Sequence, residues 1–386
     1  MQKKISLFFI VGMVGVLAVA TIVSAQDIVQ DESESRRSLG EGGFPPDEYY
    51  KGTVIKILTK EDRDYIPSSD IVQKLRVRIE DGVSKGIEVG AENNIPTNSQ
   101  KGTELAVGDM VVLVATYGVE GRMYYVTDRY RFSALGMLAA IFIVFVLIFG
   151  RLRGLSSLIG LAFSICVIAF FIVPQILRGT DPLTISLIGS LVIACISLYL
   201  AHGFSVRTSI ALGGTLITLL FSALCSILFV GIGKLFGAGN EDALFLQLQD
   251  SQAINLRGLL LGGMIIGILG ILDDITTAQT AAVDEIQKAN PKLSRKELYA
   301  RGISVGREHI TSLVNTLALA YAGVSLPLFL LFILNKGQPL WVILNGEPIA
   351  EEVIRTLVGS LALIVAVPLT TFLAVEVYHN RRTHEV

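Results

Sequence analysis

The chain has 386 residues, of which 52% are hydrophobic and 17% are charged, with a net charge of −2 and a mean hydropathy of +0.60. Soluble domains carry about 25% charged residues, so the composition argues against an ordinary soluble protein. The near-neutral charge and the lack of a basic patch with interleaved aromatic residues exclude a nucleic-acid partner.

The N-terminal residues have the pattern of a secretory signal peptide. Two lysines precede an apolar run over residues 5–23, and small residues lead up to Ala25, after which cleavage is predicted. An uncleaved N-terminal anchor is the alternative, and either one exports the segment after residue 25. Residues 26–47 are rich in Asp, Glu, Ser and Gly, bury little apolar surface, and are predicted to be a flexible linker.

Residues 48–131 are predicted to form a small exported β domain. The segment 75–80 alternates apolar and charged side chains, which is typical of a strand with one buried face. Further β-rich runs cover residues 54–58, 110–115 and 123–126. About five short strands predict a small β-barrel of OB or SH3-like type. The strands lack clustered basic and aromatic residues, so a structural role or a protein partner is favoured over an oligonucleotide.

From residue 132 to about 380 the chain contains long apolar runs, which predict membrane-spanning helices. The runs predict about seven helices, at residues 133–150, 155–173, 182–201, 208–233, 257–287, 308–334 and 354–378. Asp181-Pro182 predicts a capped helix start, and Asn290-Pro291 predicts a helix end. Ser294 and Glu297 form a capping-box pattern in an amphipathic cytoplasmic segment at about 288–307. The fold class is therefore an α-helical polytopic membrane protein with a β-barrel-like N-terminal domain.

The distribution of positive charge predicts how the chain is oriented in the bilayer, because cytoplasmic loops are enriched in Lys and Arg. With the barrel outside the cell, eleven basic residues lie inside: Arg151, Arg153, Arg207, Lys288, Lys292, Arg295, Lys296, Arg301, Arg307, Arg381 and Arg382. Only five lie in outside loops: Arg178, Lys234, Arg257, Lys336 and Arg355. This places residues 26–131 outside the cytoplasm and the C-terminus inside it.

The most informative polar residues are Asp273 and Asp274, which come directly after a Gly-rich apolar run. Charged side chains are rare within membrane helices and mark functional sites there. At 1.5 Å per residue, Asp273 lies about 24 Å from Arg257, near the cytoplasmic edge of a hydrocarbon core of about 30 Å. Two interpretations stay open: a polar functional cavity, or the ordinary end of a membrane span.

Helical spacing separates the two acids. Asp273, Thr277, Thr280 and Asp284 share one stripe, and Asp274 belongs to the next. Carboxylate and hydroxyl oxygens suit a hard cation such as Mg²⁺ or Na⁺, or a relayed proton. Asp273 is the first candidate ligand, and no other cofactor is evident.

Other helices supply further candidate ligands. Glu308 and Asn315 share a face of the predicted sixth helix, and Glu376 lies near the inner end of the last. For Glu376, an ordinary interfacial acid is the favoured interpretation. Within the fifth helix, Gly258-xxx-Gly262 and Gly263-xxx-Gly267 are small-residue patterns that let another helix approach closely.

Several of these motifs together resemble those of the YibE/F family of multi-pass bacterial membrane proteins. The motifs are Gly270-Ile271-Leu272-Asp273-Asp274 with Gln279 and Glu285, then Asn315-Thr316-Leu317 and Ala320-Tyr321-Ala322-Gly323. The resemblance covers about residues 48–380 and implies a protein of the bacterial plasma membrane. The family pattern has a single acid, so the doubled acid leaves open which residue is equivalent. The resemblance implies a fold and no secure biochemical role.

Three functions are compatible with these features. A permease-like transporter for a small ion or an ion-coupled solute is favoured by the intramembrane oxygens. An accessory or sensing scaffold that binds a protein partner through the exported domain is the alternative. An intramembrane enzyme is disfavoured, because adjacent acids on one helix point about 100° apart and cannot form a dyad alone. Gly-x-Ser-x-Gly and His-Glu-x-x-His signatures are also missing from the sequence. The sequence makes no prediction of the substrate or of the oligomeric state.

Overall fold

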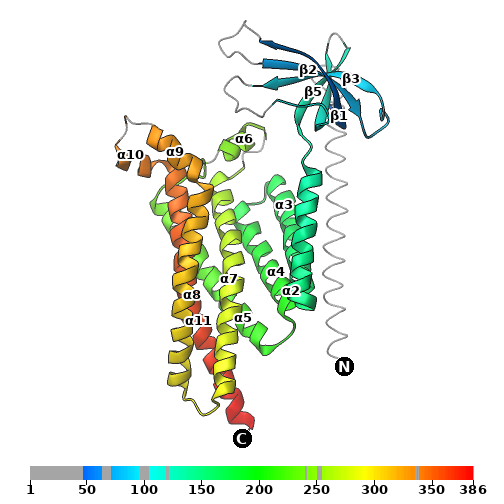
Figure 1. Ribbon diagram of the computed structural model, residues 1–386. Coiled ribbons are helices and arrows are strands. Elements are labelled where there is room, and N and C mark those ends of the chain that lie inside the picture. Colours follow the sequence, from blue (N-terminus) through cyan, green and yellow to red (C-terminus); the bar gives the residue numbers. More distant parts are fainter. Residues whose placement is uncertain are drawn as a thin grey trace. The chain divides into compact units, whose positions relative to one another are not determined.

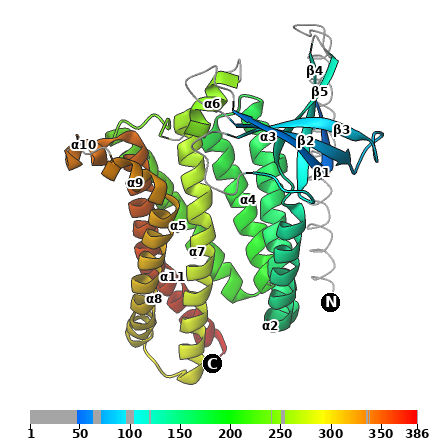
Figure 2. The same cartoon turned by 45° about the horizontal axis from the view of Figure 1, so that its top comes forward.

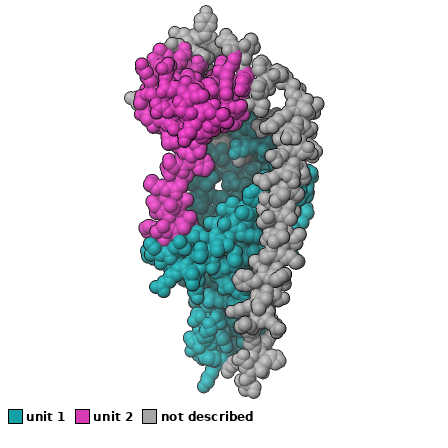
Figure 3. Space-filling model, turned by 90° about the vertical axis from the view of Figure 1, so that its right-hand side faces the viewer, with its two compact units in different colours: residues 1–25, 146–386 teal, residues 26–145 magenta. Residues whose placement is uncertain are grey.

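The computed structural model describes residues 47–62, 71–95, 104–118, 121–239, 241–249, 254–334, 337 and 339–385. The predicted signal peptide and nearly all of the predicted linker lie outside these ranges. The chain divides into two compact units, with the boundary between Phe145 and Val146 (Figure 3). Each unit has a hydrophobic core of its own.

The unit of residues 26–145, magenta in Figure 3, contains a closed five-stranded β-barrel, as predicted. Its strands are β1 (Glu48–Asp62), β2 (Ile71–Ile79), β3 (Glu88–Ile95), β4 (Met110–Gly118) and β5 (Gly121–Arg129) (Figure 1). They have the order β1-β2-β3-β5-β4 around the barrel. Neighbours are antiparallel except β3 and β5, which are parallel and pair only at Ala91–Tyr124 and Glu92–Tyr125.

The alternating pattern in β2 produces the barrel core. Leu75, Val77 and Ile79 are fully buried, whereas Arg76 and Arg78 between them are exposed. The guanidinium of Arg122 in β5 lies 5.4–5.5 Å from the ring centres of Tyr50, Tyr117 and Tyr124. It also forms an ion pair with Glu48. Arg122 therefore ties β5 to β1 and β4 through its charge.

The other unit, teal in Figure 3, is helical from residue 146 on. The start of α2 belongs to the barrel unit. The elements are α2 (Phe132–Val167), η1 (Ile168–Ile172), α3 (Val173–Leu177), α4 (Pro182–His202), α5 (Val206–Ile232), α6 (Glu241–Gln249), α7 (Leu256–Ala289), α8 (Arg295–Val324), α9 (Leu326–Leu334), α10 (Leu340–Asn345) and α11 (Glu347–Glu385). Among the described residues, five helices are long and apolar enough to cross a membrane: 132–177, 182–202, 206–232, 256–289 and 347–379. The predicted count of seven is not confirmed.

The helix from Phe132 to Leu177 has an internal break. Arg151 adopts φ 50° and ψ −135°, a left-handed conformation that is uncommon for any residue but glycine. The chain folds back locally there. Gly154 lies next to Val146, eight positions earlier: a Cβ added at Gly154 would lie 3.0 Å from Cγ1 of Val146. Uninterrupted, 46 residues of helix would be about 69 Å long, more than twice the hydrocarbon thickness.

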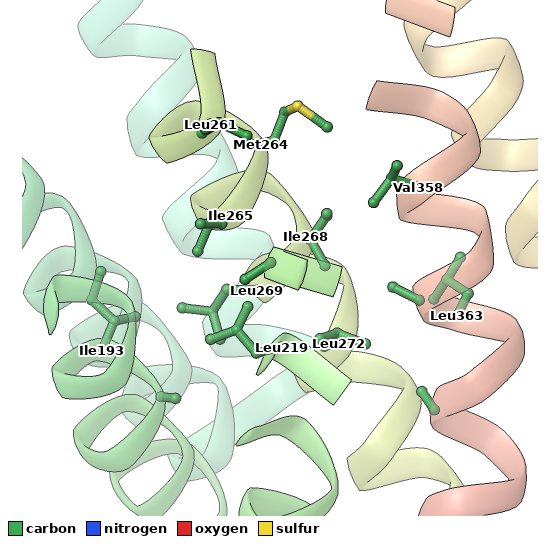
Figure 4. Close-up of a cluster of buried hydrophobic side chains, with 14 of the residues drawn as sticks. Ile193, Leu219, Leu261, Met264, Ile265, Ile268, Leu269, Leu272, Val358 and Leu363 are labelled. Atoms are coloured by element: carbon green, nitrogen blue, oxygen red, sulfur yellow. The ribbon is translucent and has the colours of Figure 1, made fainter. Parts of the chain in front are cut away.

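α7 lies at the centre of the helical unit, as both ribbon views show (Figures 1 and 2). It contacts α4, α5, α8 and α11. Its apolar face carries Leu261, Met264, Ile265, Ile268, Leu269 and Leu272, which pack with Ile193 of α4, Leu219 of α5, and Val358 and Leu363 of α11 (Figure 4). The helix is buried here because this stripe is apolar at the helical period.

The small-residue patterns on α7 have different environments. Gly258 and Gly262 pack closely on α4, where an added Cβ would lie about 3.1 Å from Pro182. Gly263 and Gly270, by contrast, have no described atom within 4 Å of such a Cβ. The prediction of close packing is thus correct for the first pattern, and the second leaves Gly263 on an open face.

Several helix boundaries differ from the prediction, and α11, for example, begins at Glu347 rather than near residue 354. α8 begins at Arg295, with the predicted capping box between Ser294 and Glu297 present, and continues to Val324. Residues 295–307 of the amphipathic segment and residues 308–324 of the predicted helix are therefore one continuous helix, because no breaking residue separates them. The helix breaks at Ser325, and Pro327 lies in the first turn of α9, where the missing N–H costs nothing.

The end of α5 is fastened to the start of α11. A carboxylate oxygen of Glu347 accepts hydrogen bonds from the backbone N–H groups of Phe236 (2.6 Å) and Gly237 (3.0 Å). Glu351, one turn further on, accepts from the N–H of Gly239 at 3.0 Å. The loop after α5 therefore wraps around the first turns of α11.

Candidate functional site

The two adjacent carboxylates lie within a continuous helix. α7 continues to Ala289, so Asp273 and Asp274 do not end it. Asp273 is partly buried, and its Oδ1 atom is buried with no hydrogen-bond partner among the described residues. Asp274 is exposed and lies within electrostatic reach of His202 at the end of α4. The acids therefore have different neighbours, as their helical spacing predicts.

Buried hydroxyl groups run along one face of α5, and we call them the hydroxyl file. Its members are between 0 and 2% exposed: Thr208, Thr215, Thr218, Ser222 and Ser226. They span 18 positions, or about 27 Å of helix, which is close to the hydrocarbon thickness of about 30 Å. The sequence prediction missed these residues, although their helical spacing within an apolar run was a readable signal.

The hydroxyl file faces polar residues on α7 and α11. Oγ1 of Thr215 lies 2.8 Å from Oγ1 of Thr276 on α7. One turn further along α7, Nε2 of Gln279 donates to the hydroxyl of Thr371 on α11 (2.7 Å) and to the carbonyl of Gly302 on α8 (2.8 Å). These three polar contacts connect four helices inside the bundle.

Several buried oxygens in this region have no partner among the residues that the structure describes: Ser190 Oγ, Thr218 Oγ1, Asp273 Oδ1, Gln279 Oε1 and Thr370 Oγ1. They come from α4, α5, α7 and α11, each of which contacts at least two of the others. Most buried polar atoms in proteins are hydrogen-bonded, so such a group of unpaired ones needs an explanation such as water or an ion.

A polar cavity of about 200 Å³ lies beside the Asp pair, and we call it the arginine cavity. It is lined by residues of α2, the α4–α5 loop region and α7: Arg153, His202, Ser205, Arg207, Thr208, Ala211 and Thr277. Of these, only Thr277 was predicted as a site residue. The two arginines were predicted only as inside charges, because nothing in their spacing shows that they meet.

The remaining candidate residues do not gather around Asp273. Thr280 is buried, and its hydroxyl donates to the carbonyl of Thr276 at 2.7 Å. Asp284 is ion-paired with Lys288 at 2.7 Å, and Glu376 with Arg295 at 3.2 Å. Glu308 and Asn315 are both exposed on α8. The described residues contain no group of three or more His, Cys, Asp or Glu side chains that could hold a metal, so the cation stays a prediction.

The comparisons with known proteins agree with the sequence motifs. A family model described as YibE/F-like protein matches residues 138–380. No curated protein and no solved structure matches the chain. The matched range includes α4, α5, α7, α8 and nearly all of α11, and so contains both the hydroxyl file and the arginine cavity.

Proposed function

The chain belongs to the YibE/F-like family, and from that premise we propose that this membrane protein is a permease for a small ion or an ion-coupled solute. The observation that carries the proposal is the hydroxyl file together with the unpaired oxygens around it. Leaving a polar group buried without a hydrogen bond costs about 1–3 kcal/mol. Several such unpaired groups in one helical bundle reduce its stability. They are explained if water and a small ion pass between the helices and form hydrogen bonds and ligand contacts with these groups.

Asp273 is the residue to which we assign the ion or the proton. Its buried, unpaired oxygen offers a ligand without first breaking another bond. Thr276 lies on the adjacent buried face of α7 and reaches the hydroxyl file through Thr215. An ion at Asp273 would therefore exchange its carboxylate ligand for hydroxyl oxygens, which are the ligands that hard cations accept.

Flux into proteoliposomes tests the proposal. Purified full-length protein would be reconstituted with a gradient of H⁺, Na⁺ or Mg²⁺, and ion entry would be measured with an indicator dye. Asp273→Asn is expected to remove most of the flux. Glu285→Gln is the matched control, because Glu285 is an exposed acid on the same helix, paired with Lys288. Equal flux in wild type and Asp273→Asn would refute the assignment.

A thermal-shift panel in detergent identifies the ion separately from its movement. A ligand that binds only the folded state raises the melting temperature with its concentration. The ion that Asp273 holds is expected to stabilise the wild type and not Asp273→Asn. Loss of stabilisation in Glu285→Gln as well would assign the effect to surface charge.

The proposed orientation places the barrel outside the cytoplasm and the C-terminus inside it, in the bacterial plasma membrane. The distribution of Arg and Lys supports it. Single cysteines at Arg78 in the barrel and Arg301 on α8, in a background without the native cysteines, would be tested with a membrane-impermeant maleimide on intact cells. Labelling is expected only at residue 78, and labelling only at residue 301 would reverse the orientation.

A second candidate function, a partner-binding scaffold, is favoured by one feature of the barrel. A groove of about 460 Å³ lies where β3 and β5 pair at only two positions, and its lining includes Arg122, Tyr124 and Tyr125. A protein that copurifies in stoichiometric amount with the full chain, and is lost on deletion of residues 48–131, would support this function. Full ion flux after the same deletion would support transport.

A further inference from the structure

The arginine cavity differs chemically from the Asp273 region that it adjoins. Arg153, Arg207 and His202 bring nitrogen donors to it. The hydroxyls of Ser205 and Thr208 lie 2.9 Å apart, and the Thr277 hydroxyl donates to the carbonyl of Asp273 at 2.8 Å. Such a lining is rich in hydrogen-bond donors, so it suits a ligand rich in acceptors. The two guanidinium groups repel a cation, which makes this a second site with a different ligand preference.

The two arginines are exposed and are not neutralised by an ion pair with any described residue. Among the described residues, neither Arg153 nor Arg207 forms an ion pair within 4.0 Å, although both act electrostatically on His202. The one acid that also acts on His202 is Asp274. The lining itself contains two guanidinium groups and no carboxylate, so the cavity wall is positive. Guanidinium groups are planar donors that bind carboxylate and phosphate oxygens in pairs.

The backbone adds to the same preference. α5 begins at Val206, next to the cavity, with Ser205 as its N-cap. The Ser205 hydroxyl accepts from the N–H of Thr208 at 3.1 Å and lies 2.9 Å from the Thr208 hydroxyl. The first N–H groups of a helix have no partner within it, and its dipole favours negative charge at this end. The positive end of this 27-residue helix therefore favours an anion, as the two arginines do.

The volume limits the ligand to a small one. The cavity holds about 200 Å³, less than the roughly 300–1,000 Å³ of pockets that enclose drug-sized ligands. At about 30 Å³ per water molecule, it admits a tetrahedral anion with a few waters. We propose that the arginine cavity binds a phosphate-class oxyanion, either free or as the headgroup phosphate of an anionic lipid. The inference rests on the proposed function in one respect: if the bound anion is free, it would be the solute that the permease transports or couples to an ion.

The test is binding, measured without transport. Full-length protein in neutral detergent would be titrated with inorganic phosphate, against chloride at equal ionic strength, by thermal shift and calorimetry. Arg153→Gln and Arg207→Gln are each expected to weaken phosphate binding by about 10-fold or more, since each removes charge-assisted hydrogen bonds. Arg301→Gln is the matched control, because Arg301 is an exposed arginine on α8 outside the cavity. It is expected to bind like the wild type.

A second arm separates the two sources of phosphate. Wild type and both cavity variants would be placed in nanodiscs of phosphatidylcholine, with or without phosphatidylglycerol. Stabilisation by phosphatidylglycerol that is lost in both variants and kept in Arg301→Gln assigns a lipid headgroup. Stabilisation by inorganic phosphate with the same pattern assigns a free anion.

Two results would overturn the inference: no response of the wild type to either phosphate source, or an equal loss in Arg301→Gln and in the cavity variants. If a glutamine variant does not fold, Arg153→Lys and Arg207→Lys replace it, since they keep the charge and lose the paired geometry. Phosphate binding without flux of any cation or of phosphate would contradict only the permease. Cation flux that needs Asp273, without phosphate binding, would contradict only this site.

Discussion

Two neighbouring glycines on α7 provide a matched test of how the bundle packs. A Cβ at Gly262 would lie 3.0 Å from the Cβ of Ser186 and 3.1 Å from the carbonyl oxygen of Pro182, and closer still to Oγ of Ser186. A Cβ at Gly263 would have nothing within 4 Å among the described residues. Gly262→Ala and Gly263→Ala are the same chemical change at nearly the same depth, so they isolate the effect of the α4 contact.

The magnitude comes from two separate contributions. Replacing a helical glycine by alanine stabilises a helix by about 1 kcal/mol, and this applies at both positions. Overpacking a tight contact costs about 1–3 kcal/mol, and this applies only at Gly262, because the Pro182 carbonyl is backbone and cannot move aside cheaply. The two variants should therefore differ by about 1–3 kcal/mol, with Gly263→Ala at or above the wild type.

Thermal unfolding in detergent, monitored by circular dichroism, measures the difference. For a unit of roughly 240 residues, about 1 kcal/mol corresponds to about 2–4 °C, so the melting temperatures should differ by about 2–12 °C. Ser186→Gly removes the side-chain part of the clash and should recover part of the loss in Gly262→Ala. Equal melting temperatures would refute the α4–α7 contact. A larger loss in Gly263→Ala would show that its open face is covered in the membrane.

Two further variants test local interactions. Asp181 caps α4 by accepting from the N–H of Thr184 at 3.0 Å, and this bond, together with those from the Thr184 hydroxyl and the Asn255 amide, holds the pKa of its carboxyl below the ordinary value. Asp181→Ala should cost about 0.5–2 kcal/mol at pH 7. A lowered pKa stabilises fully above the ordinary value of 3.8, and this stability is lost as pH falls through the lowered pKa, so the difference in melting temperature from wild type should narrow below pH 3.8. A difference independent of pH would contradict the role of the carboxylate. In the barrel, Arg122→Gln should lower the free energy of unfolding by about 1–3 kcal/mol, because three cation–π contacts are lost. The control Arg78→Gln should lower it by at most about 1 kcal/mol, because its ion pair with Glu88 is exposed. Equal losses of stability, measured by thermal melts that follow tyrosine absorbance, would refute this prediction.

Most of the fold could be predicted from local patterns. The alternation at Leu75–Ile79 predicts β2, and Asp181 and Asn290 mark helix boundaries, because turns and caps depend on a few adjacent residues. β3 was not identified individually, since Glu88–Ile95 lacks a clear apolar alternation. The capping box at Ser294 was recognised, but the helix that it starts was divided in two.

The site was less predictable, because it depends on which face of each helix turns inward. Helical spacing correctly grouped Glu308 with Asn315, yet spacing alone cannot show that this face of α8 is exposed. Gln279 and Thr276 lie on the buried face of α7, beside the predicted stripe that begins at Asp273. Arg153 and Arg207 are 54 positions apart in sequence, and only the packing of α2, α4, α5 and α7 brings them to one cavity.

The fastening of Glu347 and Glu351 to the loop after α5 has a mechanical consequence. α5 and α11 lie in contact, and the backbone donors from Phe236 to Gly239 hold the C-terminal end of α5 against the first turns of α11. A joint at one end of two long helices makes that end a pivot. Any relative tilt of α5 and α11 is then greatest at the far end, where Thr208 and the arginine cavity lie. At that far end the two helices are held by apolar packing instead, because Ile210 of α5 clusters with Ala374 and Val375 of α11.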